Sequence, residues 1–224
     1  MTLRVLKTLS PQFLYQALIL SASTSTVSKM EVKTPDKSTV LFDFTKCSPA
    51  DIAAWSEVSD TVREPGMSKA VLSLQRTRLF QRAVMFAMIN PQPNGAGFAG
   101  VLTTIPESAA SHAESTGLRL HVRGQGQLQH WKVVLTDRDQ VEVRGGYEYE
   151  QKFQLQTMSE RQFETVELPF SNFWAFKWGK EVEDAPPFDL VKTGTFGFQT
   201  FGGVYDNYKQ QGTGSLEIDF VSFY

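Results

Sequence analysis

Short apolar runs alternate with glycine, asparagine, aspartate and proline from about residue 40 to the C-terminus. In residues 118–123, leucine and valine alternate with arginine and histidine, and residues 131–135 repeat this pattern. Near the C-terminus, Leu216, Ile218 and Phe220 oppose two acidic residues. Because successive side chains of a strand point to opposite faces, this alternation predicts strands with one apolar face. The candidate strands are residues 40–44, 82–89, 98–105, 118–123, 131–135, 153–157, 163–168, 195–201 and 216–223.

About ten short strands with almost no amphipathic helix predict an all-β domain over residues 40–224. Each strand has one apolar face to bury, which favours two packed antiparallel sheets, with a closed barrel as the alternative. Residues 82–89 are apolar on both faces and predict a central strand. Ser48 followed by proline predicts one short helix that ends near Trp55. Residues 106–117 predict a polar loop, and turns are expected near residues 136–140 and 144–146.

The first 30 residues differ from the rest, because they contain no acidic residue and carry Arg4, Lys7 and Lys29. This composition fits a mitochondrial transit peptide, and the apolar residues 13–20 also fit a secretory signal. The apolar stretch is far shorter than the ~20 residues that cross a bilayer. The polar residues 31–39 predict a linker to the folded domain.

The charge and cysteine content of the chain argue against several classes of function and of site. The net charge of −2 and the isoelectric point near 6.0 argue against a nucleic-acid binder. Cys47 is the only cysteine, so the chain can form neither an internal disulfide nor a cysteine zinc cluster. Since secreted sandwiches often carry disulfides, the single cysteine favours a reducing compartment, and with it the transit peptide over the secretory signal.

The candidate chemistry is sparse. His112, His121 and His130 are spaced by nine residues, which suits a metal pair on neither a strand nor a helix. The chain has no nucleophile elbow, P-loop or dinucleotide fingerprint. The acidic residues Glu181, Glu183 and Asp184 fit a solvated loop better than a calcium site, as does Asp206. We therefore expect no enzymatic activity, no metal and no cofactor.

The segment FWAFKW is the densest aromatic stretch, with Phe173, Trp174, Phe176 and Trp178. As a strand it would place Phe173 on one face and the other three rings on the opposite face. These rings could cap the sandwich core. They could instead be exposed anchors for a partner protein or a sugar, because large aromatic residues dominate binding hot spots.

Five segments, taken in order, resemble the complex I intermediate-associated protein family. They are WSEVSDTVREPGMS (55–68), GFAGVL (97–102), LRLHVRGQGQ (118–127), VELPFSNF (166–173) and GSLEIDFVSFY (214–224). The resemblance implies a galactose-binding-like jelly-roll sandwich with no enzymatic activity and no cofactor. It also implies a mitochondrial matrix protein that assists assembly of respiratory NADH:ubiquinone oxidoreductase. Such a protein would be held at the inner membrane by partner proteins, and residues 1–30 would be its transit peptide.

Two of these motifs depart from the family pattern. The family usually has Gly-Gly before the serine of its first motif, whereas this chain has one glycine there, Gly66. The second motif is commonly R-G-D-G-R, and residues 123–127 read R-G-Q-G-Q. If the missing Asp–Arg pair held a ligand or partner, this chain would bind it more weakly; if the pair only shaped a hairpin, the glycines suffice. The positions that still match are Asp60, Gly66, Ser68, Arg123, Gly124 and Gly126.

Three functions follow as hypotheses. An assembly chaperone for complex I predicts a contiguous exposed apolar patch, with Trp174 to Trp178 as its candidate site. A carbohydrate-binding module predicts a concave site with aromatic platforms and polar side chains, and a secreted location. A hydrolase would require a histidine beside a nucleophile in a cleft, which no spacing here favours.

Overall fold

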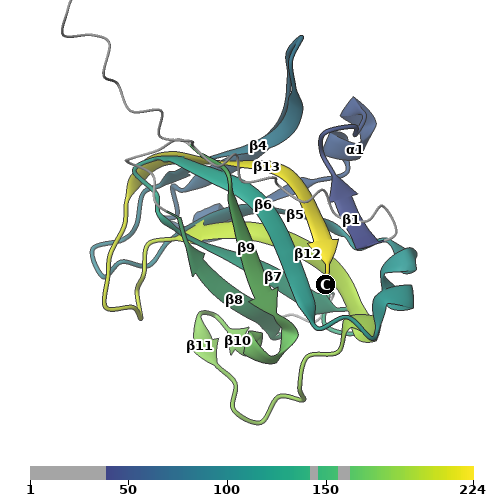
Figure 1. Cartoon of the computed structure of the whole chain (residues 1–224). Helices are drawn as coiled ribbons and strands as arrows, with labels where there is room; N and C mark the ends of the chain where they lie inside the picture. The colour runs from purple at the N-terminus through teal and green to yellow at the C-terminus, as the bar shows by residue number, and fades with distance from the viewer. Residues whose placement is uncertain (1–38, 142–145, 156–161) are drawn as a thin grey trace, which may run out of the picture. The chain divides into compact units, whose positions relative to one another are not determined.

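The computed structural model describes residues 39–141, 146–155 and 162–224, and these residues form two antiparallel sheets (Figure 1). The strands are β1 (Val40–Asp43), β2 (Ser56–Ser59), β3 (Lys69–Arg76), β4 (Gln81–Ile89), β5 (Phe98–Thr104), β6 (Gly117–Gly126), β7 (His130–Asp137), β8 (Glu148–Gln154), β9 (Glu164–Pro169), β10 (Trp174–Lys177), β11 (Lys180–Glu181), β12 (Thr193–Phe201) and β13 (Gly212–Phe223). The helices are α1 (Pro49–Ala53) and the short 3₁₀ turns η3 (Asp60–Val62), η4 (Glu107–His112), η5 (Phe170–Asn172) and η6 (Leu190–Lys192).

One sheet has the order β3-β4-β13-β6-β9, with β1 paired to β13, and the other has the order β11-β10-β8-β7-β12-β5-β2. Consecutive strands such as β5 and β6, or β12 and β13, lie in different sheets, which is the crossing pattern of a jelly roll. The prediction of an all-β jelly-roll sandwich is confirmed, and the closed barrel is wrong.

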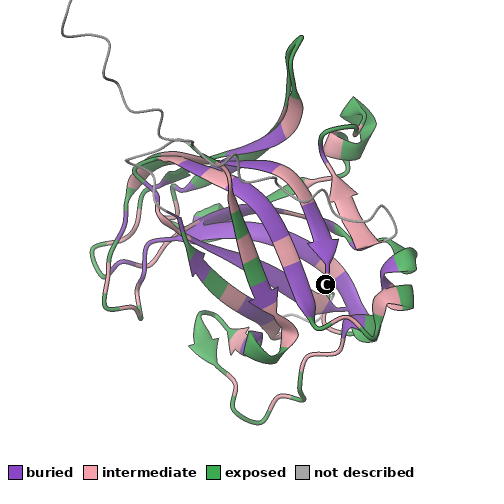
Figure 2. Ribbon diagram, in the orientation of Figure 1, coloured by how far each residue is buried: buried purple, intermediate pink, exposed green. Residues whose placement is uncertain are grey.

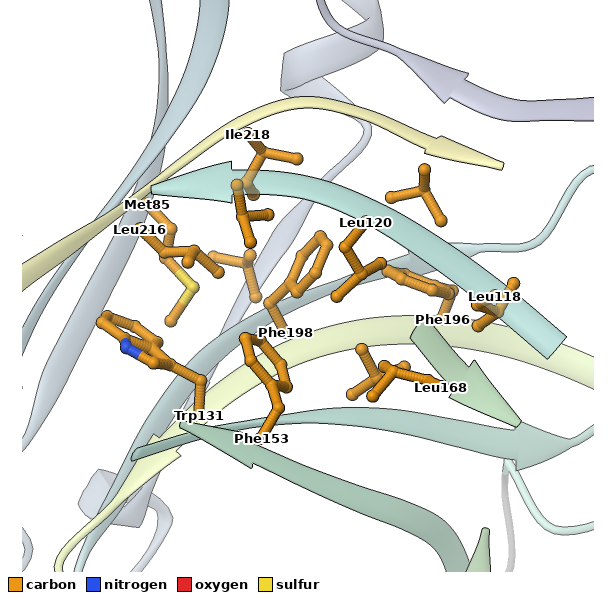
Figure 3. Close-up of a cluster of buried hydrophobic side chains, with 14 of the residues drawn as sticks. Met85, Leu118, Leu120, Trp131, Phe153, Leu168, Phe196, Phe198, Leu216 and Ile218 are labelled. Carbon is orange, nitrogen blue, oxygen red and sulfur yellow. The ribbon is translucent and has the colours of Figure 1, made fainter. Parts of the chain in front are cut away.

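The core lies between the two sheets and is built from the inward faces that alternation predicts. Leu120 of β6, Trp131 of β7 and Phe198 of β12 are fully buried and pack into one cluster (Figure 3). Alternation along single strands is visible as changes between buried and exposed residues (Figure 2). Large aromatic side chains supply much of this packing because each removes a large apolar area from water.

The alternation predicted for the last strand fails at Phe220. β13 pairs Ile218 with Val122 and then Phe220 with His121, so Asp219 is one extra residue, a β-bulge. After the bulge, Val221 and Phe223 point into the core, whereas Phe220 is half-buried and stacks on the His121 ring at 5.1 Å. A single inserted residue therefore exchanges the two faces of the strand.

Several predicted boundaries also differ. The strand expected at 153–157 is β8, which begins five residues earlier; residues 156–157, and most of the turn expected at 144–146, lie outside the described residues. The loop 106–117 contains η4, because the buried Ala109 anchors it to the core. Residues 82–89 form an inner strand as expected, yet Phe86 and Met88 are exposed on its outer face.

The short helix is confirmed where expected. The Ser48 hydroxyl accepts from the Asp51 N–H at 3.3 Å, and the Asp51 carboxylate accepts from the Ser48 N–H at 2.7 Å. This reciprocal capping box fixes the start of α1. Trp55, two residues beyond its end, packs against Phe198. The predicted transit peptide (1–30) and all but the last residue of the predicted linker (31–39) lie outside the described residues.

Candidate functional site

A groove of about 1130 Å³ lies over the outer face of the sheet that contains β7, β8 and β12. Its floor carries Lys132 of β7, Glu150 and Lys152 of β8, and Gln199 of β12. These residues alternate with the buried core residues of the same strands, so the core and the groove share one sheet. The walls come from the β10–β11 hairpin, the loop 203–206 and the loop 61–63.

The floor holds two ion pairs, of which Lys132–Glu150 is buried and Lys152–Asp206 is partly exposed. Lys132 and Lys152 lie opposite each other in the β7–β8 register, and each has its own carboxylate. The Lys132 Nζ donates to Glu150 at 2.5 Å, with side chains only 9% and 3% exposed. The Lys152 Nζ donates to Asp206 at 2.6 Å. Asp206 lies in a loop, as predicted, and its partly exposed carboxylate closes one side of the groove by pairing with β8.

Glu148 adds a third carboxyl group to the β8 side of the groove. Burial raises its pKa to about 7, the positive charge of Lys132 opposes the rise, and the charge of Glu150 adds to it. A hydrogen bond to Glu150 adds to it further. Near pH 7 the Glu148 carboxyl is therefore partly protonated and can act as a hydrogen-bond donor as well as an acceptor.

Aromatic rings form one wall of the groove, beside its polar floor. Phe176 is half-buried, whereas Trp178 and Tyr205 are 79% and 58% exposed. Trp178 and Gly179 form the two-residue turn between β10 and β11, with φ of 51° and 78° as a type I′ turn requires. A bulky residue with positive φ is uncommon, so the fold holds Trp178 in a costly conformation at an exposed tip.

The structure separates the four predicted aromatic candidates. Phe173 is 5% exposed and belongs to the core cluster, so it is not available to a partner. Phe176 and Trp178 line the groove, and Trp174 is 58% exposed but does not line it. The alternation expected for this segment is therefore present: Phe173 packs into the core, and Trp174 and Trp178 are exposed.

The first family motif supports one wall of the groove. Ser68 donates to both Asp60 carboxylate oxygens, from its N–H at 2.9 Å and from its hydroxyl at 2.7 Å, and both residues are buried. A Cβ at Gly66 would lie 2.0 Å from the Asp60 carbonyl oxygen, so only glycine fits there. This contact closes the loop that carries residues 61–63 to the groove edge.

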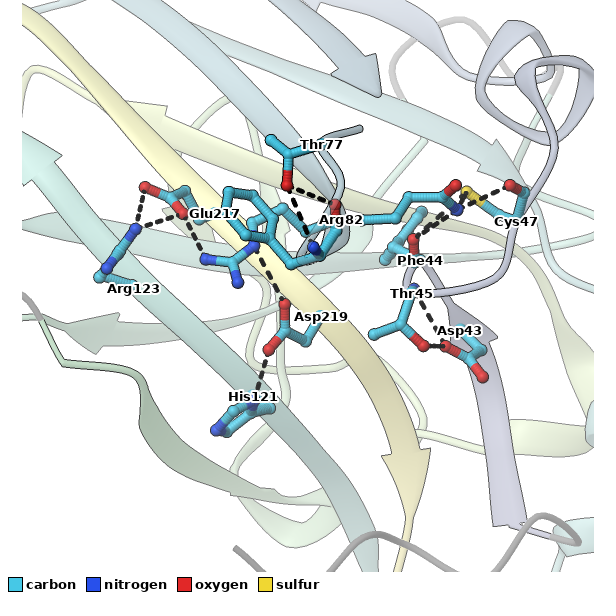
Figure 4. A network of polar contacts seen from close by, with 12 residues as sticks. Asp43, Phe44, Thr45, Cys47, Thr77, Arg82, His121, Arg123, Glu217 and Asp219 are labelled. Carbon is cyan, nitrogen blue, oxygen red and sulfur yellow. Dashed lines mark hydrogen bonds and ion pairs between the residues drawn. The ribbon is translucent and has the colours of Figure 1, made fainter. Parts of the chain in front are cut away.

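The second family motif lies on the other sheet, away from the groove. Arg123 of β6 donates to Glu217 of β13 at 2.7 Å, and Arg82 of β4 donates to the same carboxylate at 2.8 Å (Figure 4). Gln125 also donates to Glu217, and the Gln127 Oε1 accepts from the Thr213 N–H at 3.0 Å. Both glutamines that replace the family's Asp and Arg thus bond within the fold.

The two motif glycines lie on either side of Gln125. Gly124 pairs with Leu216 in the β6–β13 ladder, and Gly126 has a φ of 89°, a left-handed value that a side chain would disfavour. Gly126 lies where β6 ends and the chain turns toward β7. The second motif therefore shapes and anchors this part of the sheet.

The three histidines are separate. His112 stacks on Phe223, His121 lies 3.1 Å from Asp219, and His130 stacks on Tyr208. Burial lowers the pKa of His130, an effect that the negative charge of Asp206 opposes.

The acidic loop is exposed at Glu181, Glu183 and Asp184. Within the part of the chain that the structure describes, no three His, Cys, Asp or Glu side chains are grouped to hold a metal ion. Among residues 39–141, 146–155 and 162–224, no helix is long and apolar enough to cross a lipid bilayer.

Known structures share the sandwich. The family 11 carbohydrate-binding module from Clostridium thermocellum, in complex with a β-1,3-1,4-mixed-linked tetrasaccharide, matches with a TM-score of 0.58 at 14% identity, over 83% of this chain and 94% of the module. The family 11 module of the cellulosomal cellulase Lic26A-Cel5E of Clostridium thermocellum matches with a TM-score of 0.52 at 14% identity, over 82% and 92%. At this identity the likeness shows the fold alone.

Comparison by sequence finds no match among curated proteins. A family profile does match, over residues 42–218, and its description is complex I intermediate-associated protein 30 (CIA30). The resemblance carried by the five sequence segments is thereby confirmed. The chain belongs to the complex I intermediate-associated protein 30 family.

Proposed function

We propose that this protein is a non-enzymatic assembly factor for respiratory complex I. It would act by binding assembly intermediates and other assembly factors. The observation that carries the proposal is the family match over residues 42–218, which spans nearly all of the sandwich. The groove and the exposed aromatic rings offer apolar surface and hydrogen-bonding groups, which suits a protein that binds its partners without catalysis.

Trp174 and Trp178 are the partner anchors in this proposal. Both are largely exposed, Trp174 on β10 and Trp178 in the turn that joins β10 to the edge strand β11. Exposed tryptophans supply a large apolar area with few rotatable bonds, which makes them effective at protein interfaces. Phe176 lines the adjacent groove wall, and Phe173 holds the segment to the core.

The location follows from the same proposal. Residues 1–30 would act as a mitochondrial transit peptide and residues 31–39 as a linker, placing the sandwich in the matrix. Contact with the inner membrane would come through partner proteins. An import assay with isolated mitochondria tests this: removal of residues 1–30 should abolish uptake. Cotranslational entry of the intact chain into microsomes would instead support the secretory signal.

Co-purification tests the partner surface. A tagged chain should retain complex I subunits, and the double variant Trp174→Ala with Trp178→Ala should lose most of them. The matched control is Val71→Ala with Phe86→Ala, which removes two exposed apolar side chains from the opposite sheet. If both double variants are folded and recover the subunits equally, β10 is not the partner surface.

A further inference from the structure

Beyond assembly, we propose that the groove on the β8–β7–β12 face is a binding site for a neutral oligosaccharide. Its volume of about 1130 Å³ slightly exceeds the usual range of small-molecule pockets, about 300–1,000 Å³. It is an open groove and not a closed cavity, so it suits a chain of several sugar rings better than one ring.

The floor is the face of a sheet and not its edge. The backbones of β5, β12, β7 and β8 pair with one another in continuous antiparallel ladders beneath the groove. An extended peptide binds such a domain by adding a strand to an edge, where backbone groups are free to pair. A ligand over this face must be recognised by side chains, which suits a molecule that carries its own hydroxyl groups.

The charges in the groove oppose an anionic ligand. Among the described residues, the charged lining is four carboxyl groups against three cationic groups: Glu57, Glu148, Glu150 and Asp206 against Arg63, Lys132 and Lys152. Both lysines are already paired, to Glu150 and to Asp206. On the groove floor, a phosphate or sulfate group would therefore meet lysines whose charges are already neutralised by carboxylates.

The same pairs suit hydroxyl groups. A carboxylate in an ion pair keeps unused acceptor sites, and an ammonium group keeps unused donors. The Gln199 amide lies beside Lys132, on the neighbouring strand β12 and opposite Lys132 in the register. A sugar hydroxyl both donates and accepts, so it can bridge such a pair without breaking it.

The aromatic wall provides the second half of the recognition. Phe176, Trp178 and Tyr205 line the same groove, and the Tyr205 ring lies against Gly179, 3.3 Å from the position a Cβ would take there. The electron-rich faces of such rings attract the polarised C–H groups of a sugar ring. The left-handed turn at Trp178 sets the backbone that presents the most exposed of these rings at the groove wall.

The test uses the purified full chain and neutral polysaccharides. Migration is measured in native gels that contain a soluble β-glucan, an α-glucan or a galactomannan, and the best polymer's tetrasaccharide is then titrated by calorimetry. At least one neutral polymer should retard the chain, whereas sulfated heparin should not. Trp178→Ala and Tyr205→Ala should each weaken binding by about tenfold, and Gln199→Ala by a similar factor. The matched control, Trp174→Ala, removes an equally prominent ring outside the groove and should leave binding within about twofold.

Thermal unfolding confirms that each variant is folded before its affinity is compared. Absence of retardation by all three neutral polymers would overturn the proposal, as would equal losses from Trp174→Ala and Trp178→Ala. Loss of complex I subunits on Gln199→Ala, without any saccharide binding, would assign the groove to a protein partner instead. Saccharide binding is measured on the isolated chain, so it is independent of the assembly role. The chain can fail to bind saccharides and still assist assembly, or bind saccharides without assisting assembly.

Discussion

Replacement of Glu148 by glutamine should stabilise the fold at neutral and alkaline pH. Glu148 sits on β8 opposite Phe176 of β10, and its burial raises the pKa of the carboxyl group from an ordinary value of 4.5 to about 7. A raised pKa means that the folded chain holds a proton in the range between these two values that the unfolded chain releases. Folding stability contributed by this proton is therefore complete below pH 4.5 and is lost as pH rises through 7.

The magnitude follows from the size of the shift. A change from 4.5 to about 7 corresponds to about 3 kcal/mol between the protonated and ionised forms in the folded chain. Glu148 is partly accessible to water, so about 2 kcal/mol is a fairer expectation. Glu148→Gln carries no charge at any pH, and its amide can donate to Glu150 as the protonated carboxyl does. The variant should be more stable than the natural chain by about 2 kcal/mol at pH 8.5 and nearly equal to it at pH 4.5.

Urea unfolding followed by tryptophan fluorescence at pH 4.5, 6, 7 and 8.5 measures this difference. The comparison is between variant and natural chain at each pH, so that other titrating groups cancel. Glu150→Gln is the control, because it leaves Lys132 buried without its carboxylate and should destabilise the fold by about 3 kcal/mol at pH 7. A difference for Glu148→Gln that does not change with pH, or a loss of stability at pH 8.5, would refute the reasoning.

Three further substitutions probe the core, the first family motif and the hairpin turn by urea unfolding. Trp131→Ala removes a fully buried ring and should cost about 3–5 kcal/mol; a cost below about 1 kcal/mol would contradict its place in the core. Ser68→Ala removes the hydroxyl that donates to the buried Asp60 and accepts from the Asn90 N–H, and it should cost about 2–3 kcal/mol, with an unchanged midpoint as the contrary result. Gly179→Ala places a side chain at a φ of 78° and should cost about 1 kcal/mol, whereas a stabilised variant would exclude the left-handed turn beside Trp178.

The sequence predicted most strands whose alternation is uninterrupted, although it missed β3, where Ala70 and Leu72 alternate with exposed residues. β6 and β7 were found correctly because their apolar residues recur at every second position up to the turn. β13 was found but misassigned after Ile218, because a bulge changes the facing of every later residue and leaves no local mark. β8 was placed too late because its outward residues are Glu148, Glu150 and Lys152, which look like a polar loop.

The groove could be predicted only in part. Phe176 and Trp178 stood out because four aromatic residues fall within six positions. The floor did not, since Lys132, Glu150 and Gln199 come from three strands that only the sheet order brings together. The one local sign of the groove floor in the sequence was the alternation of charged and aromatic residues over 148–153, which indicates a strand with one charged face. No pattern in the sequence predicts that Lys152 pairs with Asp206, which lies 54 residues away.

The most direct test of the assembly role is native-gel separation of mitochondrial complexes after deletion of the gene that encodes this chain. Complex I should be lost or arrested as smaller intermediates while the other respiratory complexes remain, and the intact chain should restore it. Normal levels of mature complex I in the deletion strain would contradict the assembly role.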